Sequence, residues 1–309
     1  MPMLILALLL LALPARAQDR LTVLLDWFVN PDHGPLYVAL ERGEFAAEGL
    51  AVELIAPADP NDPPKLVAAG RADLAISYQP QLHLQVAAGL PLARIGTLVE
   101  TPLNALVVLA GGPVRSIADL KGRSIGFSVG GFEDALLGAM LRRHGLSLKD
   151  VRLVNVNFSL SPSLVTGQVD AVIGAFRNFE LNQLDILGRP GRAFYPEEEG
   201  VPAYDELILV AHRERLADPR LARFLNAVER GTIYLTNHPA ESWGLFIKGR
   251  PKLDDELNRR AWRDTMARFA KRPGALDRAR YTRFAAFLKE AGMIGEPPEL
   301  ARYAVELAR

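Results

Sequence analysis

Short apolar segments alternate with segments of helical periodicity over the first two-thirds of the chain. Residues 21–25, 52–55 and 73–76 are apolar and short, as buried strands are. Between them, residues 35–42 and 65–69 carry apolar side chains at helical spacing, and clusters of Pro and Asn separate the units. This alternation with short connections predicts an α/β fold with helices on both faces of a sheet.

The pattern changes in the last third of the chain. One more apolar strand, residues 206–210, is followed by helices only, and the first of these repeats apolar side chains at i, i+3, i+4 and i+7. In the simplest arrangement the chain crosses into a second lobe near Gly111 and returns near Leu207, with a ligand cleft between the lobes and hinges near Gly111 and Asp205. The expected segments are 18–109 and 207–309 in lobe 1, and 110–206 in lobe 2.

A weak internal repeat supports two related lobes. Gly-Arg-Ala-Asp-Leu-Ala-Ile at residues 70–76 recurs in form as Gly-Gln-Val-Asp-Ala-Val-Ile at residues 167–173. A Gly-Leu pair recurs at nearly the same offset, at residues 49–50 and 145–146. In each copy the glycine is expected to close a helix in the left-handed conformation before a buried strand. The alternative is that any α/β fold reuses this order of helix, glycine and strand.

Residues 1–17 have the features of a secretory signal peptide. Residues 4–13 are almost entirely Leu, Ile and Ala, a run too short to span a bilayer, and Ala15-Arg16-Ala17 forms a small-x-small cleavage site. We expect cleavage between Ala17 and Gln18 and export of a soluble chain to the periplasm. No Cys follows the apolar run, which excludes lipid attachment through Cys. A buried N-terminal helix is the alternative.

Composition and charge remove several classes of function. Lys plus Arg and Asp plus Glu both number 36, so the formal net charge is 0, which argues against a nucleic-acid-binding surface. The chain has no Cys, which excludes disulfides, thiolate metal sites and a Cys nucleophile. None of the five His is paired at metal spacing, and phosphate-loop, dinucleotide-binding and nucleophile-elbow motifs are absent. We therefore expect no metal, no cofactor and no nucleic acid.

Polar and aromatic side chains gather at the ends of the predicted strands. Ligands of α/β sheets bind beside such strand ends, and aromatic side chains there can stack on a flat ring. An aromatic residue taken singly is more often part of the core, and this is the alternative for Trp27 and Phe176. Against it, Asn30 and Glu180 each lie within four positions of one of them. The candidates are Asp26, Trp27, Asn30, His33, Tyr78, Gln79, Asn104, Phe176, Arg177, Asn178, Glu180 and Tyr204.

A loop between a predicted strand, residues 125–127, and the helix after it is a further candidate. It reads Ser128-Val129-Gly130-Gly131. Backbone N–H groups at a helix N-terminus can hold an anion or a polar group, so we include Ser128 and Gly130 among the candidates. A plain turn is an equally good interpretation.

Several motifs resemble those of one family of binding proteins. The most distinctive is Asp-Trp-Phe-Val-Asn-Pro-Asp-His-Gly-Pro-Leu-Tyr-Val-Ala at residues 26–39. Together with further matches the motif resembles the ThiY-type substrate-binding proteins of the NMT1/THI5-like group, which deliver thiamine pyrimidine precursors to ABC importers. The further matches lie at residues 57–63, 78–80, 101–104, 161–164, 170–175, 178–180 and 200–207.

The resemblance covers about residues 21–210 and implies both a fold and a function. The fold is a two-lobed periplasmic-binding-protein clamshell of type II, which closes on a ligand in the cleft between its lobes. The ligand is formylaminopyrimidine or hydroxymethylpyrimidine. The partner is an ABC permease in the inner membrane, and the binding protein is expected to be a monomer.

The resemblance also implies roles for individual residues. Trp27 is expected to stack on the heteroaromatic ring, with Tyr78 at its other face or edge. Glu180 is expected to bind the amino edge of the pyrimidine, with Asn30 and Asn178 completing the polar contacts. The predicted ligand-binding set is Trp27, Asn30, His33, Tyr78, Asn104, Ser128, Gly130, Phe176, Asn178, Glu180 and Tyr204.

Two departures from the family pattern affect the expected ligand. Val29 stands where many relatives have Pro, and Phe176-Arg177 stands where relatives often have Tyr-Trp. A cation in place of an aromatic side chain can change the ring that a site accepts. Other relatives bind riboflavin, alkanesulfonates or other nitrogenous compounds, and these remain alternatives. Arg177 also allows Glu180 to be a solvated first-turn helix residue, paired with that cation.

An enzyme of the same fold is the competing hypothesis. The eukaryotic pyrimidine-phosphate synthases share the fold and much of the opening motif, but they hold pyridoxal phosphate with a Lys just after the third strand and iron with a Cys-rich motif. Ser77 stands at about the position of that Lys, and the chain has no Cys. Without an amine no Schiff base forms, so the residues favour a binding protein that does not transform its ligand.

Overall fold

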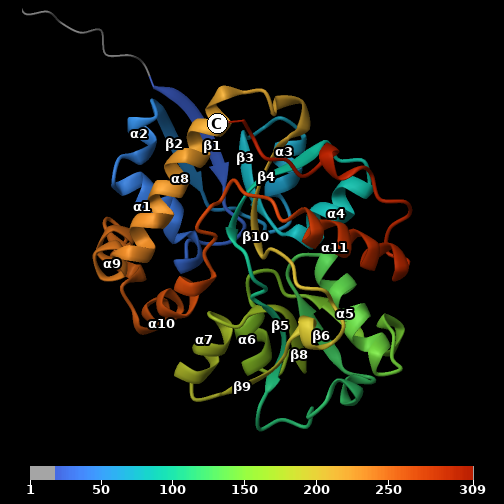
Figure 1. Cartoon of the computed structure of the whole chain (residues 1–309). Coiled ribbons are helices and arrows are strands. Elements are labelled where there is room, and N and C mark those ends of the chain that lie inside the picture. Colours follow the sequence, from blue (N-terminus) through green and yellow to red (C-terminus); the bar gives the residue numbers. More distant parts are fainter. Residues whose placement is uncertain (1–17, 309) are drawn as a thin grey trace, which may run out of the picture.

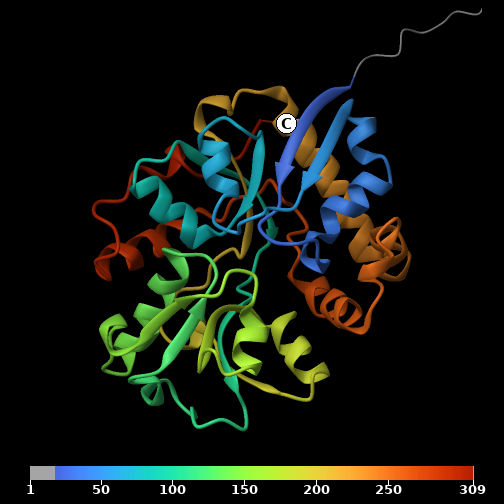
Figure 2. The same ribbon diagram turned by 180° about the vertical axis from the view of Figure 1, so that it is seen from behind.

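Two five-stranded sheets organise the protein, whose computed structural model describes residues 18–308. Figure 1 shows them in two parts of the molecule: the blue and cyan strands lie in one part with the orange and red C-terminal helices, and the green strands lie in the other. The same division is visible from behind in Figure 2. The expected signal peptide, residues 1–17, lies outside the described residues.

The first sheet combines strands from both ends of the chain. Its order is β2-β1-β3-β10-β4, with β1 parallel to β2 and β3, and β10 antiparallel to β3 and β4. The strands are β1 (Asp19–Leu24), β2 (Leu50–Ile55), β3 (Leu74–Ser77), β4 (Leu92–Val99) and β10 (Leu207–His212). The helices of this part are α1 (Gly34–Glu41), α2 (Glu44–Ala47), α3 (Pro63–Ala68), α4 (Gln79–Ala87), α8 (Pro219–Asn237), α9 (Pro239–Ile247), α10 (Glu256–Thr265) and α11 (Arg278–Glu290).

The second sheet repeats the arrangement of the first. Its order is β7-β6-β8-β5-β9, with β6 parallel to β7 and β8, and β5 antiparallel to β8 and β9. The strands are β5 (Asn104–Leu109), β6 (Ser124–Phe127), β7 (Arg152–Asn155), β8 (Ala171–Phe176) and β9 (Gly191–Phe194), and the helices are α5 (Phe132–Arg143), α6 (Leu160–Val165) and α7 (Glu180–Ile186). Short 3-10 helices are η1 (Pro31–His33), η2 (Ile117–Leu120), η3 (Leu148–Asp150), η4 (Pro196–Glu198), η5 (Arg213–Arg215), η6 (Pro251–Leu253), η7 (Met266–Arg268) and η8 (Leu300–Arg302).

The equal strand order gives the sequence repeat a structural counterpart. Gly70 and Gly167, which open the two copies, have φ angles of 70° and 75° and follow α3 and α6. A side chain would strain this left-handed backbone, so glycine fits both positions. The strands that follow, β3 and β8, occupy the same place in their sheets.

The chain changes sheet earlier than we expected. β5 pairs with β8 and β9, so the crossing falls between the end of β4 at Val99 and the start of β5 at Asn104. Gly111 follows β5 on the second sheet and is not at the crossing, because the apolar strand before it completes that sheet. The chain returns to the first sheet at Leu207, the first residue of β10.

Glu206 joins the two crossing segments. Its Oε2 accepts hydrogen bonds from the backbone N–H groups of Leu103 and Asn104, at 2.5 and 2.9 Å. The side chain is fully buried, and burial raises its pKa to about 7. Next to it, Asp205 accepts a 2.8 Å hydrogen bond from the Thr97 hydroxyl. The connections between the sheets therefore lie side by side and are tied together by buried carboxyl groups.

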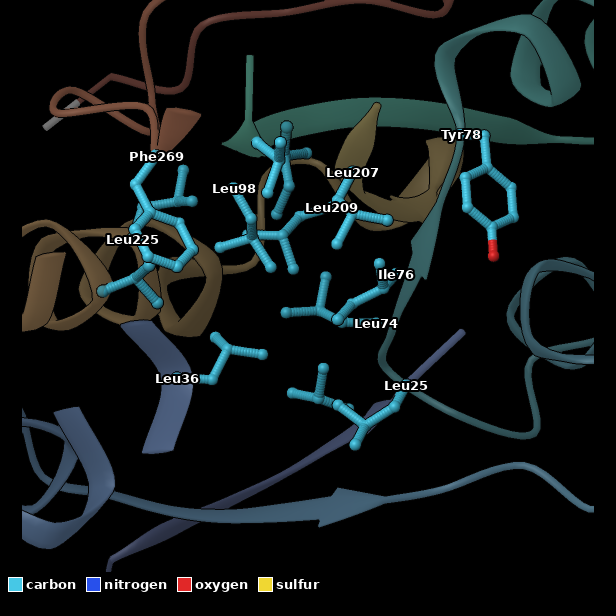
Figure 3. Packing of buried hydrophobic residues seen from close by; sticks show 14 of the residues in the cluster. Leu25, Leu36, Leu74, Ile76, Tyr78, Leu98, Leu207, Leu209, Leu225 and Phe269 are labelled. Atoms are coloured by element: carbon cyan, nitrogen blue, oxygen red, sulfur yellow. The ribbon is translucent and has the colours of Figure 1, made fainter. Parts of the chain in front are cut away.

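The C-terminal helices complete the core of the first part. Leu221, Phe224, Leu225 and Val228, which repeat along α8 at helical spacing, are all buried. In Figure 3 Leu225 and Phe269 lie beside the leucines of the first sheet, while Tyr78 stands at the margin with its hydroxyl directed away from the cluster. Along residues 18–308 no helix combines the length and the apolar character needed to cross a membrane.

Candidate functional site

A cavity lies where segments of the two parts meet. The segment after β1, Tyr78 after β3, the start of α5, the end of β8 and the start of α7 supply its walls. The space not filled by atoms is about 390 Å³, part of it open to solvent. The lining residues are Asp26, Trp27, Asn30, Asp32, Tyr78, Glu133, Leu160, Gly174, Phe176, Phe179 and Glu180.

Asp26 is fixed between two side chains at the wall of the cavity. Its Oδ1 lies 2.8 Å from Nε2 of His33, and its Oδ2 accepts a 2.8 Å hydrogen bond from the Tyr78 hydroxyl. The backbone N–H of Asn30 donates to Nδ1 of His33, which leaves the proton of the neutral ring on Nε2, facing Asp26. His33 is fully buried behind the wall, so it orients Asp26 and does not line the cavity.

Asn30 and Asp32 are held by η1 (Pro31–His33). Asn30 caps this short helix, because its Oδ1 accepts a 2.8 Å hydrogen bond from the backbone N–H of Asp32. Oδ1 of Asp32 accepts hydrogen bonds from Nδ2 of Asn178, at 2.6 Å, and from the Thr265 hydroxyl, at 2.9 Å. Its buried Oδ2 has no hydrogen-bond partner among the described residues, and burial raises the pKa of Asp32 to about 6.

Glu180 is the first residue of α7, and only 7% of it is exposed. Its Oε2 accepts a 2.7 Å hydrogen bond from the backbone N–H of Phe176. Burial raises the pKa of Glu180 to about 8, against the opposing effect of that hydrogen bond. Arg177 pairs with both carboxylate oxygens of Glu197, at 2.7 and 3.0 Å. The interpretation of Glu180 as a solvated partner of Arg177 is therefore wrong.

Glu133, in the first turn of α5, brings a further buried carboxyl group to the wall. Its Oε2 accepts a 2.8 Å hydrogen bond from the backbone N–H of Ser128. Burial raises its pKa well above the usual range, although backbone hydrogen bonds from Ser128 and Val129 oppose that rise. The carboxyl group rests against Gly174, where a Cβ atom would lie only 2.3 Å from Oε1.

Aromatic side chains cover the rest of the wall. Trp27 meets Phe158 edge to face, with ring centroids 4.6 Å apart, so one segment of each part contributes to this contact. Tyr78 stacks on Phe132 at 4.7 Å and meets Phe176 edge to face at 6.4 Å. Flat aromatic surfaces next to hydrogen-bonding carboxyl groups suit a small planar ligand that carries N–H donors.

The structure brings part of the predicted set together. Trp27, Asn30, Tyr78, Phe176 and Glu180 all line the cavity, and the contact of each with a ligand stays a prediction. Asn178 stands directly behind the wall. Its Nδ2 donates to Asp32 and also to the Thr265 hydroxyl, and its buried Oδ1 has no partner among the described residues.

Contrary to prediction, Asn104 and Tyr204 are not on the wall. Asn104 is buried at the start of β5, next to β8, where its Oδ1 accepts a 3.1 Å hydrogen bond from the Gly174 N–H. Tyr204 is fully buried, with its ring edge to face with Phe284 at 5.5 Å. Asn104 begins β5 and Tyr204 precedes β10, so both lie at strand ends as expected, but they are buried in the fold and do not line the cavity.

The loop at residues 128–131 is not an open cradle for a ligand. Besides the Ser128 N–H, which donates to Glu133, the Gly130 N–H donates to Oδ1 of Asn61 at 2.9 Å. Neither Ser128 nor Gly130 lines the cavity, contrary to prediction. The reason is that side chains of this chain occupy the N–H groups that a ligand would need.

Several residues that line the cavity were not predicted from the sequence. Asp32 lies within the opening motif and Phe179 within the Asn-Phe-Glu motif, so each carried a usable signal. Glu133 follows a pair of glycines at a predicted helix start, a weaker signal, and Leu160 carried none. Gly174 looked like a strand residue, and only its contact with Glu133 shows why it lacks a side chain.

The buried carboxyl of Glu180 predicts a pH dependence of stability. Its pKa is about 8 in the folded protein and near 4.5 when exposed, so between these values the folded state holds a proton that the unfolded state has lost. The stability of the ligand-free protein should therefore fall as pH rises from about 4.5 to 8. Relative to Glu180→Gln, the slope should be steeper by up to about 1.4 kcal/mol per pH unit.

Urea unfolding of both proteins between pH 5 and 8 measures the difference. Asp32 and Glu206, with pKa values of about 6 and 7, act in the same direction. The pKa of His83 falls to about 3 through burial, so its contribution is lost as pH falls below about 6.5. Glu206 and His83 contribute equally in both proteins and cancel in the comparison. Asp32 also raises the pKa of Glu180 through charge repulsion, so the difference in slope includes the interaction between these two carboxyl groups. Equal slopes would contradict the assignment of a protonated Glu180.

The sequence of this chain is similar to those of a known protein family and of several individual proteins. A family model described as NMT1/THI5 like matches residues 30–242. A Haemophilus influenzae protein named as a thiamine biosynthesis protein is 54% identical over 300 residues, which cover 97% of this chain and 96% of that protein. The formylaminopyrimidine-binding protein of Halalkalibacterium halodurans is 35% identical over 244 residues, or 78% of this chain and 73% of that protein.

Enzymes also occur among the relatives. The 4-amino-5-hydroxymethyl-2-methylpyrimidine phosphate synthase of Uromyces fabae is 30% identical over 254 residues, which cover 78% of this chain and 74% of the enzyme.

Among solved structures, the alkanesulfonate-binding protein SsuA from Xanthomonas axonopodis pv. citri superposes with a TM-score of 0.72 at 18% identity, covering 94% of this chain and 98% of that one. This likeness confirms the expected two-lobed α/β binding-protein fold.

Proposed function

The chain belongs to the NMT1/THI5-like family, and we propose that it is the solute-binding component of an ABC importer that captures an aminopyrimidine precursor of thiamine. The ligand is formylaminopyrimidine or its hydroxymethyl counterpart. The binding protein named for formylaminopyrimidine and the thiamine biosynthesis protein among its relatives support this ligand class.

One observation carries the proposal. The buried carboxyl group of Glu180 lies in the wall of a cavity that is lined mainly by aromatic rings and further carboxyl groups. An aminopyrimidine presents an exocyclic N–H donor beside a ring nitrogen. A carboxylate can accept from the amine and from a protonated ring nitrogen, and a neutral carboxyl can donate to the nitrogen while accepting from the amine.

The flat ring of the ligand fits the aromatic part of the wall. Trp27 is half-buried at the cavity and available to stack on one face of a heteroaromatic ring. Tyr78 is held by its hydrogen bond to Asp26 and is placed at the other face or the edge. Stacking and the two-point contact with Glu180 together would fix the plane and the rotation of the ring.

Catalysis of the kind performed by the synthase relatives is the second candidate. It requires an amine that can form a Schiff base, and no Lys of the described part of the chain lines the cavity. Ser77, which stands near the expected position of that Lys, is fully buried and donates a 2.9 Å hydrogen bond to Oε1 of Gln81. We therefore propose that the protein binds its ligand and releases it chemically unchanged. We also propose that it is exported to the periplasm, where it delivers the ligand to a permease as a monomer.

Titration calorimetry of the mature chain with both aminopyrimidines tests the proposed function. We expect one-to-one binding of at least one of them, recovered chemically unchanged after incubation, as mass spectrometry would show. Native mass spectrometry of the purified protein should also reveal a small molecule that co-purifies with it. Absence of binding by both compounds would refute the ligand class, and an altered pyrimidine would refute the absence of catalysis.

We also propose that the two parts are lobes that open and close as ligand leaves and enters. Hydrogen bonds bridge them at several points. Asn178 Nδ2 donates to Asp32 Oδ1 at 2.6 Å, and the Asn61 amide bonds the Ser128 carbonyl and the Gly130 N–H at 3.1 and 2.9 Å. Between α7 and α10, Asn182 donates to Asp264 at 2.7 Å and Arg260 to Asp185 at 2.6 Å. Opening breaks these bonds, and the crossing segments, residues 100–103 and 195–206, serve as the hinge.

Saturating aminopyrimidine should therefore decrease the radius of gyration in small-angle scattering. The physical reason is that the ligand contacts side chains of both lobes and is bound fully only when the cleft is closed. Glu180→Ala at the same ligand concentration provides the control and should remain as expanded as the ligand-free protein. An unchanged radius of gyration in the wild type would contradict the hinge.

A further inference from the structure

The cavity offers carboxyl groups but no cation. Asp26, Asp32, Glu133 and Glu180 all contribute to its wall, whereas no Lys, Arg or His does among the described residues. A phosphate or sulfonate in a buried site needs either a positive charge or several free N–H donors. Ionised carboxyl groups repel an anion, and protonated ones still supply no positive charge.

The N–H donors next to the cavity are already taken. At the start of α5, Glu133 accepts the Ser128 N–H at 2.8 Å, and the backbone of Val129 also donates to this carboxyl group. The Gly131 N–H donates to Oδ1 of Asp134 at 2.7 Å, and Asn61 receives the Gly130 N–H. All four N–H groups of the loop thus point at side chains of the chain itself.

The position of Glu133 is built into the fold. Gly174, in β8, has a φ angle of 93°, and its missing side chain leaves the space that the Glu133 carboxyl fills. An alanine there would be strained by its backbone and would lie within 2.3 Å of Oε1. Glu133 itself is only 3% exposed, so the carboxyl group is held in one place between the loop and the strand.

We propose that Glu133 is a specificity-determining residue: its carboxyl group occupies the place of an anion at the start of α5, so that the cavity admits an aminopyrimidine without a phosphate or sulfonate group and excludes the anionic forms. This inference rests on the proposed function and states which chemical form of that ligand is captured. A ligand phosphate would meet an acidic group where it needs N–H donors, which is a repulsive element of specificity.

Calorimetry with hydroxymethyl aminopyrimidine, its monophosphate and the sulfonate MOPS tests the inference. The wild type should bind the monophosphate at least roughly 100-fold more weakly than the free pyrimidine, because the phosphate would be buried with neither a cation nor a free loop N–H group to pair with it. MOPS should not bind measurably. In Glu133→Ala the N–H groups of Ser128 and Val129 lose their acceptor and become free for a phosphate, and the ratio of the affinities for the two pyrimidines should narrow by at least about tenfold.

Asp134→Ala is the matched control. This change frees the neighbouring N–H group of Gly131, but Asp134 lies outside the cavity wall. The ratio of the affinities for the two pyrimidines should therefore stay at the wild-type value. Glu133→Gln keeps one side-chain oxygen, where the carboxyl group has two, to accept from the loop N–H groups, so its affinity ratio should fall between those of the wild type and Glu133→Ala. Circular dichroism shows whether each variant is folded. If Glu133→Ala does not fold, the ratio of the two pyrimidine affinities in the wild type is sufficient to test the inference.

Comparable binding of the monophosphate and the free pyrimidine by the wild type would overturn the inference and leave the proposed function standing. An unchanged ratio in folded Glu133→Ala would also overturn it, because another feature would then exclude the anion. Failure of both pyrimidines to bind would refute the proposed function, and with it the inference that depends on it.

Discussion

Replacing Glu180 by alanine should weaken aminopyrimidine binding by about 30-fold to several thousand-fold. Loss of one member of a buried, charge-assisted hydrogen-bonded pair costs about 2–5 kcal/mol, because the other member stays buried without its partner. Glu180 meets the conditions for so large an effect: it is buried, it lines the cavity, and no side-chain cation within residues 18–308 pairs with it, since Arg177 pairs with Glu197. Calorimetric titration of folded Glu180→Ala measures the loss.

Two further variants separate binding from folding. Glu180→Gln keeps the acceptor for the Phe176 N–H but cannot accept from both the amine and a protonated ring nitrogen, so it should bind with intermediate affinity. Glu198→Ala removes an exposed glutamate of the same part that lies outside the cavity wall, and it should bind as tightly as the wild type. Wild-type affinity in Glu180→Ala would refute the assignment of this residue to the site.

Replacing Trp27 by alanine should weaken binding by roughly 5- to 150-fold. Stacking of a base-like ring on an aromatic side chain is worth about 1–3 kcal/mol, and the indole is the largest ring in the wall of the cavity. The edge-to-face contact with Phe158 holds the ring in place, so the stacking surface is ready before the ligand arrives. The measurement is again titration with the aminopyrimidine that binds the wild type.

The conservative change Trp27→Phe serves as the comparison. It retains an aromatic face of smaller area and should lose less affinity than Trp27→Ala. Ile233→Ala, at an exposed position on α8, should change neither affinity nor unfolding. If folded Trp27→Ala binds as tightly as the wild type, Trp27 belongs to the core contacts of the aromatic cluster and not to the ligand site.

Local patterns in the sequence were sufficient to predict many of the helices and strands of the fold. Apolar runs of strand length, such as residues 73–76, became β3 with a small shift at each end. The amphipathic spacing in residues 221–228 gave the buried face of α8. Gly70 and Gly167 marked helix ends because a positive φ is a local property that glycine alone adopts without strain.

The sequence also determined the family and part of the site. The opening motif places Trp27 and Asn30 in one short turn after β1, where both line the cavity. Tyr78 and Glu180 follow strands of the two different sheets, and their meeting in the cavity agrees with the rule that ligands bind beside strand ends. Residues in such turns are placed by the few residues around them, and their neighbours along the chain reveal them.

Only the tertiary structure decided the sheet to which β5 belongs and the partners of the buried polar groups. The apolar strand 104–109 fits either sheet by its pattern, and its partners β8 and β9 are distant in sequence. Asn178 and Asp32 are 146 positions apart, and the Glu133 carboxyl needs the gap that Gly174 leaves on another element. Periodicity reports how one segment faces the core, because it depends on adjacent residues. Which donor meets which acceptor across the cleft depends on the packing of whole lobes, and no local pattern carries that information.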